Sequence, residues 1–211
     1  MMTIAVDIND VLREYTKQFI TMYKKVIDPT FDIEYEDVDD FTVLNVFPFL
    51  DADGNPSMDL YYKFKYEDCP LELHSHANIT DPMLSANFEL WQQTTLRNFD
   101  EDKLPNLMIV SPFEMTTSIQ ATLEFLSKRM FRVREIYFPI DSMTIWDRCD
   151  ILITANPTLL ENKPEGKISF KINTPYNKDV KGDYEFNSMM EVIQDTNDTL
   201  VKIIEGKTTE E

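Results

Sequence analysis

The sequence predicts an α/β protein in which helices flank a parallel sheet, and three observations support this fold class. Short apolar runs rich in β-branched residues occur at residues 3–6 and 107–110. Each run is followed by a segment with helical apolar spacing, at residues 11–27 and 119–130. Strands that alternate with helices are typical of a parallel sheet. The apolar fraction of 43% is large enough to form a core.

The other elements follow from the same periodicities. The first helix ends at Asp28-Pro29, because the residue before proline is disfavoured in a helix. A capping box of Thr117 and Gln120 is expected to open the second helix. Further strands are predicted at residues 135–140, 150–153 and 167–173, a terminal helix at 188–205, and a frayed polar tail at 207–211.

A long segment between the first helix and the second strand interrupts the alternation. About 75 residues are too many for a connection without structure of its own, so we predict an inserted, cap-like unit. The chain then divides into an α/β core, residues 1–27 and 106–206, and an insert, residues 28–105. Within the insert we expect two strands, 42–50 and 58–66, joined by a turn at 51–57, and then a helix at 87–97.

Charge and composition exclude several classes of function. With 20 Lys and Arg against 38 Asp and Glu, the net charge is −18, and such a surface repels a phosphate backbone. We therefore expect no nucleic-acid partner. No apolar run approaches the roughly 18–20 residues of a membrane helix, and the N-terminus has no basic region before an apolar stretch, so we expect neither membrane nor secretory targeting. The four glycines form no phosphate-binding loop.

The strongest chemical signal is the carboxylate that ends the first strand. In open α/β sheets, ligands bind outside the carboxyl ends of the strands, and Asp7 stands at such an end. The alternative is that Asp7 or Asp10 only caps the helix that follows.

Four stretches resemble motifs of the haloacid dehalogenase (HAD) superfamily of phosphohydrolases, in the family's order. VDINDVLRE is similar to motif I, LMIVSPF to motif II and WDRCDILITANP to the motif IV strand. FKINTPYN resembles a late signature of the 5'(3')-deoxyribonucleotidase branch. The resemblance implies a HAD-like parallel sheet with a cap after the first helix. We expect Asp7, Ser111 and Thr154 to cluster at the carboxyl ends of neighbouring strands of this sheet.

The resemblance also implies roles for individual residues. Asp7 matches the nucleophile and Mg²⁺ ligand, and Ser111 matches the motif II hydrogen-bond donor. Ser111 also fits a helix-capping role with Glu114. Asn9 stands at the position of the acid/base aspartate, and an amide does not transfer a proton.

The metal site implied by the resemblance is incomplete. Thr154 and Ala155 replace the two motif IV acids, and no lysine lies between Arg134 and Asp150. Loss of a general acid/base costs about 10²–10⁴ in rate, and loss of the metal costs several kcal/mol more. We therefore predict a degenerate HAD-fold protein without catalysis or cofactor, acting as a structural or protein-interaction module.

The resemblance extends to relatives in tailed bacteriophages, so a phage particle is one predicted setting, and the cytoplasm is the other. A homo-oligomer is compatible with this prediction. The alternative function is a Mg²⁺-dependent phosphomonoesterase that acts on nucleoside monophosphates, with Asp7 as the metal ligand.

Two other metal motifs are weaker. Cys69, His74 and His76 have the residue types of a zinc site, although both histidines also fit ordinary polar positions. The segment 51–55 resembles the start of an EF-hand loop, but Pro56 occupies the position that needs glycine, so a turn is the better prediction.

The predicted hairpin of the insert carries a face of aromatic side chains. Because a two-stranded ribbon is marginal in water unless its apolar face is covered, we expect this face to bind a partner protein. The alternative is that the face packs on its own domain. The aromatic residues are Phe47, Phe49, Tyr62, Phe64 and Tyr66.

Overall fold

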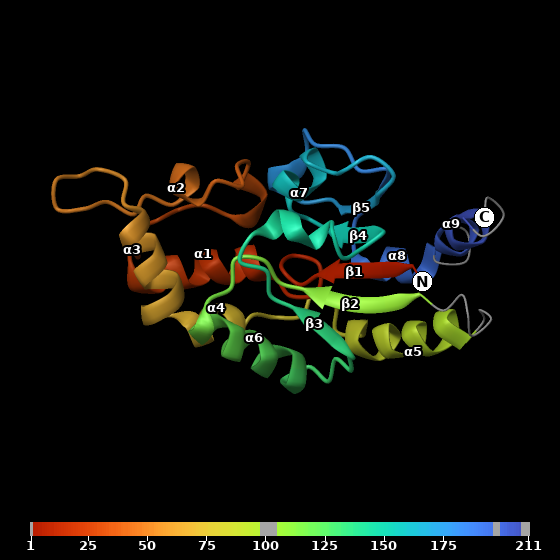
Figure 1. Ribbon diagram of the computed structural model, residues 1–211. Coiled ribbons are helices and arrows are strands. Elements are labelled where there is room, and N and C mark those ends of the chain that lie inside the picture. Colours follow the sequence, from red (N-terminus) through yellow and green to blue (C-terminus); the bar gives the residue numbers. More distant parts are fainter. Residues whose placement is uncertain (1, 98–104, 196–198, 208–211) are drawn as a thin grey trace.

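The computed structural model describes residues 2–97, 105–195 and 199–207 of the chain. Its centre is a six-stranded sheet in which every pair of neighbours is parallel, in the order β3-β2-β1-β4-β5-β6 (Figure 1). The predicted fold class, a parallel sheet with helices on both faces, is therefore confirmed. The strands are β1 (Thr3–Asp7), β2 (Asn106–Val110), β3 (Glu135–Tyr137), β4 (Ile151–Thr154), β5 (Ile168–Ile172) and β6 (Tyr184–Phe186).

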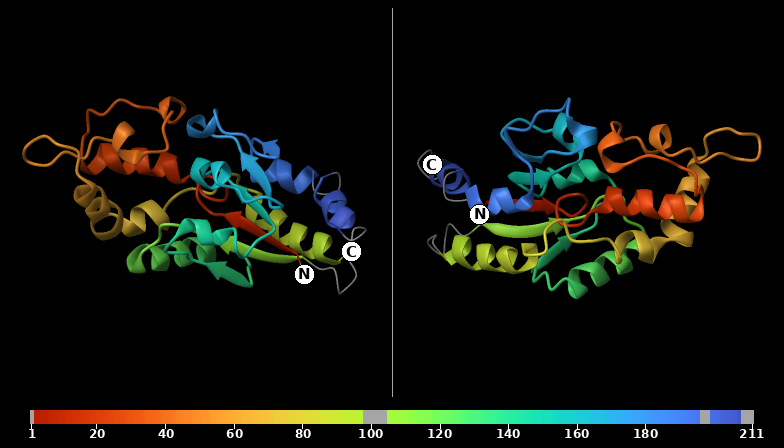
Figure 2. Two further views of the ribbon diagram at one scale, coloured as in Figure 1. Left: turned by 45° about the horizontal axis from the view of Figure 1, so that its top comes forward. Right: turned by 180° about the vertical axis from the view of Figure 1, so that it is seen from behind.

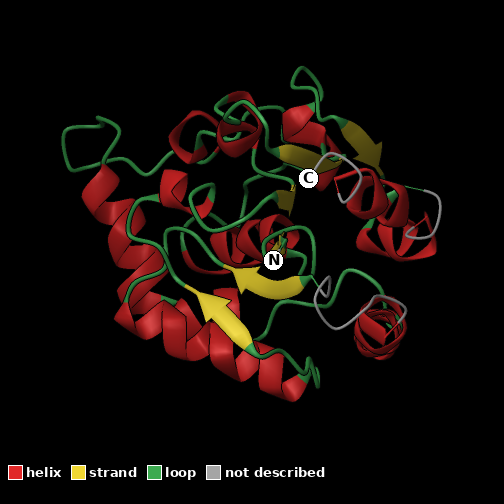
Figure 3. Cartoon of the chain, turned by 45° about the vertical axis from the view of Figure 1, so that its right-hand side comes forward, coloured by secondary structure: helices red, strands yellow, loops and turns green. Residues whose placement is uncertain are grey.

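Helices lie around this sheet, as Figure 3 shows. Their bounds are α1 (Tyr15–Val26), α2 (Val43–Val46), α3 (Met58–Lys63), α4 (Pro70–His74), α5 (Leu84–Arg97), α6 (Thr116–Lys128), α7 (Pro157–Glu161), α8 (Met189–Asp195) and α9 (Leu200–Lys207). None of them is long and apolar enough to cross a membrane.

Alternation along β1 divides the core between the two faces of the sheet. Ile4 and Val6 face a large cluster that includes side chains of α1, α5, α6 and α8. Ala5 faces a smaller cluster around Trp146, which includes Met108 of β2 and Leu159 of α7. Both faces are buried, which explains why β1, β2 and β4 read as continuous apolar runs in the sequence.

Several predicted boundaries differ from the structure. The first helix begins at Tyr15 rather than at residue 11, because residues 9–13 form a turn closed by a hydrogen bond from the Asp10 N–H to the Arg13 carbonyl. Helix α6 begins with reciprocal hydrogen bonds between Met115 and Ser118, and not with a box of Thr117 and Gln120. Strand β6 was not predicted at all.

The predictions for the C-terminal region hold in part. The predicted helix at 188–205 is present as α8 and α9, between which residues 196–198 lie outside the described residues. Most of the predicted frayed tail, residues 208–211, also lies outside them.

The prediction of a hairpin in the insert is wrong. Residues 43–46 form α2, and residues 58–68 form α3 followed by a π-helical turn, Phe64–Asp68. Ser57 begins α3 by accepting a hydrogen bond from the Leu60 N–H. The turn between them is present, since the Asp51 N–H donates to the Asn55 carbonyl and Gly54 has a φ of 80°.

The aromatic face of the insert packs on its own domain. Phe47, Phe49, Phe64 and Tyr66 are 1–7% exposed, and only Tyr62 is exposed, at 43%. The first three rings contact Tyr23 of α1, with ring centroids 5.3–6.5 Å apart. A helical insert can close over α1, and this tertiary contact overrides the alternating pattern that suggested strands.

The two ends of the insert lie in different places. Helices α2 and α3 lie at one end of the molecule, opposite α9 and the start of β1 (Figure 2). Helix α5 instead runs beside the sheet and packs against α8, and the Phe88 ring stacks edge-on against Phe131 at 5.5 Å. Among the described residues of the insert, those that line the cavity beside Asp7 all precede α5.

Candidate ligand-binding site

Three predicted residues lie where the central strands end. Asp7 pairs in register with Val110, which places Ser111 directly beyond the neighbouring strand. Thr154 ends β4 on the other side of β1, and its hydroxyl donates a hydrogen bond of 2.7 Å to Asp7 Oδ2. The prediction that Asp7, Ser111 and Thr154 lie at neighbouring carboxyl ends is confirmed.

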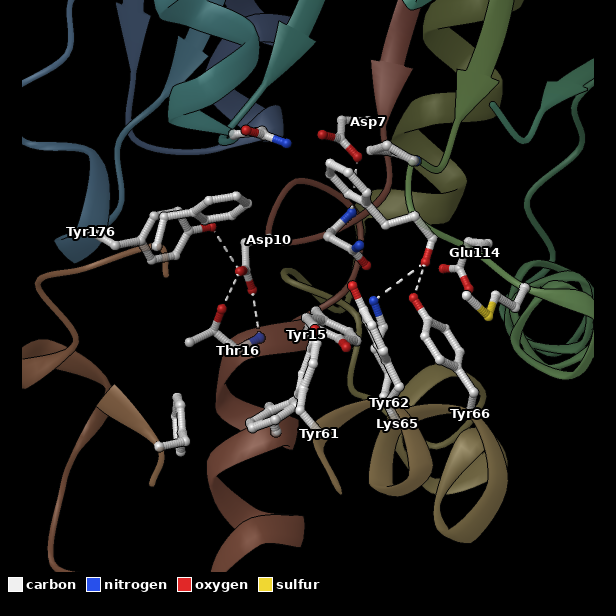
Figure 4. A pocket seen from close by; sticks show the side chains of 18 of the residues that line it. Asp7, Asp10, Tyr15, Thr16, Tyr61, Tyr62, Lys65, Tyr66, Glu114 and Tyr176 are labelled. Carbon is white, nitrogen blue, oxygen red and sulfur yellow. Dashed lines mark hydrogen bonds between the residues drawn. The ribbon is translucent and has the colours of Figure 1, made fainter. Parts of the chain in front are cut away.

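A cavity of about 490 Å³ opens beside Asp7 and reaches under the insert. This volume is within the usual range for small-molecule sites. Most of its wall is apolar and aromatic, with polar side chains from β1, the insert and the loop before α6 (Figure 4). The aromatic side chains are Tyr15, Phe19, Phe41, Phe47, Tyr61, Tyr62, Tyr66, Phe113 and Tyr176.

Asp7 is a buried carboxyl group without a cationic partner among the described residues. Burial raises its pKa to about 7, against the opposing effect of the Thr154 hydroxyl. The Asn9 N–H adds a weaker bond of 3.4 Å to Asp7 Oδ1. At neutral pH this carboxyl group is therefore divided between its acid and its anion.

Asp10 belongs to a different set of contacts. Its backbone is left-handed, with a φ of 56°, and its side chain points to Thr16 and Tyr176 (Figure 4). Oδ1 accepts from the Thr16 N–H at 3.0 Å, and Oδ2 accepts from the Thr16 and Tyr176 hydroxyls. Burial raises its pKa as well. The helix-capping alternative therefore describes Asp10, which holds the start of α1, and not Asp7.

Behind the cavity wall lies a buried ionic cluster that sequence analysis did not predict. Arg13 is fully buried, and its Nη2 donates to Glu114 Oε1 at 2.8 Å. Its Nη1 donates to the Thr122 hydroxyl at 2.7 Å and to the His74 carbonyl at 3.0 Å. We call Arg13, His74, Glu114 and Thr122 the Arg13–Glu114 cluster. No local pattern marks it, because Arg13 and Glu114 are 101 positions apart.

The pKa values of this cluster reflect its pairing. Burial alone would raise the pKa of Glu114, but the cluster around it, with Arg13 as the resident cation, holds that pKa well below its usual value. Burial lowers the pKa of His74 to about 4, so the imidazole is neutral at pH 7. His74 therefore takes part in the Arg13–Glu114 cluster as an uncharged side chain. Within the described residues, no three His, Cys, Asp or Glu side chains gather as a metal would need.

Two of the family-implied residues are committed to this cluster. The Ser111 hydroxyl is buried, does not line the cavity, and donates to Glu114 Oε1 at 3.0 Å. Asn9 does line the cavity, but its Oδ1 accepts from Arg13 Nε at 2.8 Å. Both side chains thus brace Arg13 and Glu114.

Lys65 is the functional candidate that sequence analysis missed. It lies in the π-helical turn of the insert, is 6% exposed and lines the cavity. Its Nζ lies 4.8 Å from the Tyr66 ring centre and makes one long contact, 3.4 Å, with the Phe113 carbonyl. Burial lowers its pKa to about 8. In the sequence Lys65 alternates with aromatic residues, which suggested that it lies on the polar side of a strand. The helical turn instead directs the Lys65 side chain inward.

The residues at this site do not fit Mg²⁺. Hard divalent cations take several oxygen ligands, mostly carboxylates. Asp7 offers a carboxyl group whose two oxygens already accept hydrogen bonds, and Thr154 and Ala155, which the sequence resemblance aligns with the family's acids, carry no carboxylate. Asp10 is held by Thr16 and Tyr176.

Comparisons with known proteins support the fold. No family model matches the sequence, and no curated protein matches it. YfnB of Bacillus subtilis, named as a HAD hydrolase and solved with magnesium, is similar in structure with a TM-score of 0.55 and 11% identity, over 93% of this chain and 98% of that one. A haloacid dehalogenase-like hydrolase from Burkholderia xenovorans is similar with a TM-score of 0.56 and 8% identity, over 95% and 99%. The protein therefore has a HAD-like fold.

Proposed function

We propose that the protein is a HAD-fold protein that binds a small molecule in the cavity beside Asp7 and does not hydrolyse phosphate esters. One observation carries this proposal. The cavity retains the carboxyl group at the end of β1, but the positions for the second acid and the metal ligands hold Asn9, Thr154 and Ala155. Asn9 is bonded to Arg13, and Thr154 is bonded to Asp7.

The remaining groups do not supply the missing chemistry. A general acid must reach the leaving group, and Asp10 Oδ2 instead accepts from two hydroxyls on the side away from Asp7. Without a metal, Lys65 is the one cation that the described lining residues offer to a phosphate group in the cavity. Transfer of a phosphoryl group depends on much stronger neutralisation of charge.

Burial of the insert's aromatic residues favours a small ligand over a protein partner. Phe47, Phe49, Phe64 and Tyr66 are covered by the chain itself, so they are not offered to another protein. Three expectations stay predictions of the sequence. They are a structural or protein-interaction role, a phage particle or the cytoplasm as the setting, and a homo-oligomer.

A second candidate is the Mg²⁺-dependent phosphomonoesterase acting on nucleoside monophosphates. The fold likeness to HAD hydrolases and the position of Asp7 in an aromatic cavity favour it. In this function Asp7 would attack phosphorus and displace the nucleoside, whose oxygen would take a proton from water, and a second water would then hydrolyse the aspartyl phosphate to inorganic phosphate. The Thr154 hydroxyl would hold the attacking carboxylate in place.

Phosphate release separates the two candidates. Purified protein is incubated with Mg²⁺ and either p-nitrophenyl phosphate or a panel of nucleoside monophosphates, and Asp7→Asn is the matched control. We expect no release above that of Asp7→Asn. A turnover near about 1 s⁻¹, at the low end for enzymes, that is lost in Asp7→Asn would overturn the proposal.

Restoration of the missing acid provides a second test. In Asn9→Asp the new carboxylate replaces an oxygen that already accepts from Arg13, so it pairs with the guanidinium and the protein stays folded. We expect no gain of phosphatase activity, because the metal ligands are still missing. Activity in this variant would show that Asn9 is the single defect.

A further inference from the structure

Three polar groups on one side of the cavity lack full hydrogen bonding within the described part of the chain. Glu114 Oε2 and the Tyr15 hydroxyl are buried without a hydrogen-bond partner. Lys65 Nζ has only its long contact with the Phe113 carbonyl. All three residues line the cavity, and Figure 4 shows them on the side formed by α1, the insert and the loop before α6.

The second buried lysine shows how unusual Lys65 is. The Lys171 side chain is 4% exposed and pairs with Glu185 at 3.7 Å. Lys65 is 6% exposed and forms no ion pair within 4 Å with any described residue, although Glu114 attracts its charge from farther away. Three tyrosine rings surround its Nζ instead, with centroids 4.8–6.0 Å away, those of Tyr15, Tyr61 and Tyr66. Rings of this kind favour a cation but do not replace a counter-ion.

Leaving such groups unpaired costs free energy. A buried donor or acceptor without a partner costs about 1–3 kcal/mol, and a charged one costs more. Native structures tolerate this cost mainly at functional sites, where a ligand completes the pairing. The unpaired groups here face a cavity that has room for a ligand.

We propose that the cavity binds an organic acid with an aromatic or apolar body, whose acidic group pairs with Lys65 and whose hydroxyl or amino hydrogen is accepted by Glu114 Oε2. The acidic group is a carboxylate or a phosphate monoester. This inference rests on the proposed function as a binding site and names its ligand class.

The charges of the wall favour a ligand with one acidic group. Apart from the tyrosines, the ionisable side chains among the described lining residues are four carboxyl groups, those of Asp7, Asp10, Asp40 and Glu114, and one lysine. Arg13 lies behind Glu114 and neutralises it, so it is not available to a ligand. A second acidic group elsewhere on the ligand would face Asp7 without a cation among the described lining residues. The aromatic walls bury the body of the ligand.

Calorimetric titration at pH 7 tests this with two matched pairs of probes. The pairs are 4-hydroxyphenylacetate with 4-hydroxyphenylacetamide, and thymidine 5'-monophosphate with thymidine. In at least one pair we expect the acid to bind about 10- to 100-fold more tightly than its neutral partner, as a charge-assisted hydrogen bond provides. A preference in the first pair assigns a carboxylate, and one in the second assigns a phosphate.

Two variants locate the preference. Lys65→Met should abolish it and leave the affinity for the neutral probe within about twofold. Lys63→Met, on the exposed side of the same helical segment, should keep it. Thermal unfolding confirms that each variant is folded. In the wild type, the acid should also protect Lys65 from acetylation by acetic anhydride, measured by mass spectrometry, and the neutral probe should not.

The inference is overturned if neither acid binds more tightly than its neutral partner, or if Lys65→Met keeps the preference. Absence of protection at Lys65 by a bound acid also overturns it. These outcomes are independent of phosphate release. A tight-binding acid with no turnover supports both proposals, and turnover of thymidine 5'-monophosphate overturns only the first.

Discussion

The Arg13–Glu114 cluster and the surroundings of Asp7 are both buried, yet the pKa of the carboxyl group is lowered in the first and raised in the second. Glu114 accepts from a guanidinium and two hydroxyls, and its pKa lies well below the usual value. Asp7 accepts from a hydroxyl and a backbone N–H, and its pKa rises to about 7. The difference teaches that an available cation, and not the depth of burial, decides the charge of a carboxyl group here.

This contrast also separates structural from ligand-directed groups. The cluster ties the turn before α1 to α4 and α6, and two of its atoms, His74 Nε2 and Glu114 Oε2, have no hydrogen-bond partner among the described residues. Asp7 and Lys65, by contrast, form no ion pair with another described residue. Three predictions test this difference, in order of expected effect.

The largest effect is expected when the paired cluster loses its carboxylate. Glu114→Gln keeps the shape of the side chain but leaves Arg13 as a buried cation without a counter-ion, so it should lower the free energy of unfolding by about 3–5 kcal/mol. Urea denaturation measures the loss. Glu124→Gln, which breaks the exposed ion pair with Lys128, is the control and should lose much less, because exposed pairs contribute little to stability. Equal losses in the two variants would show that the buried ion pair contributes no more to stability than the exposed one.

Asp7→Asn should remove a pH dependence rather than stability itself. The pKa of Asp7 is about 7 in the folded state, against 3.8 for the ordinary carboxyl group, so the folded protein holds the proton more tightly and stability falls as pH rises between these values. The free energy of unfolding of the wild type, relative to Asp7→Asn, should fall by about 2–3 kcal/mol from pH 5 to pH 8.

The control is Asp51→Asn. A backbone hydrogen bond from Asn55 lowers the pKa of Asp51, so this carboxylate is ionised in both states above pH 5 and should cause no change over the same range. A flat difference between wild type and Asp7→Asn would mean that Asp7 has a cationic partner in solution.

Lys65→Met should show the smallest of the three effects, with the opposite sign in pH. The pKa of Lys65 is about 8 in the folded state and 10.5 ordinarily, so the unfolded chain binds the extra proton and stability rises with pH between these values. Chemical denaturation at pH 8 and pH 9.5 should show that the wild type gains about 1–2 kcal/mol relative to Lys65→Met. Lys63→Met should keep the gain of the wild type, and its loss there would refute the assignment to Lys65.

Local patterns were enough to predict the parallel sheet and one edge of the site. Strands β1, β2 and β4 are short apolar runs because both of their faces are buried, and this signal is local. Parallel strands end at the same edge, so the side chains of Asp7, Ser111 and Thr154 were predicted to meet before any contact was known. Of the two roles expected for Ser111, the structure has the contact with Glu114, to which the Ser111 hydroxyl donates.

Contacts between distant segments were beyond the sequence. Phe47, Phe49 and Phe64 have the same local pattern whether a face is exposed or buried, and only their packing against α1 decides between the two. The partnership of Arg13 with Glu114 and the inward direction of Lys65 likewise depend on which helices meet. The sequence by itself determined the alternation of strands and helices and the position of Asp7, because these depend on neighbours along the chain. The tertiary structure alone decided which buried charges are paired, because their energies depend on groups about a hundred positions away.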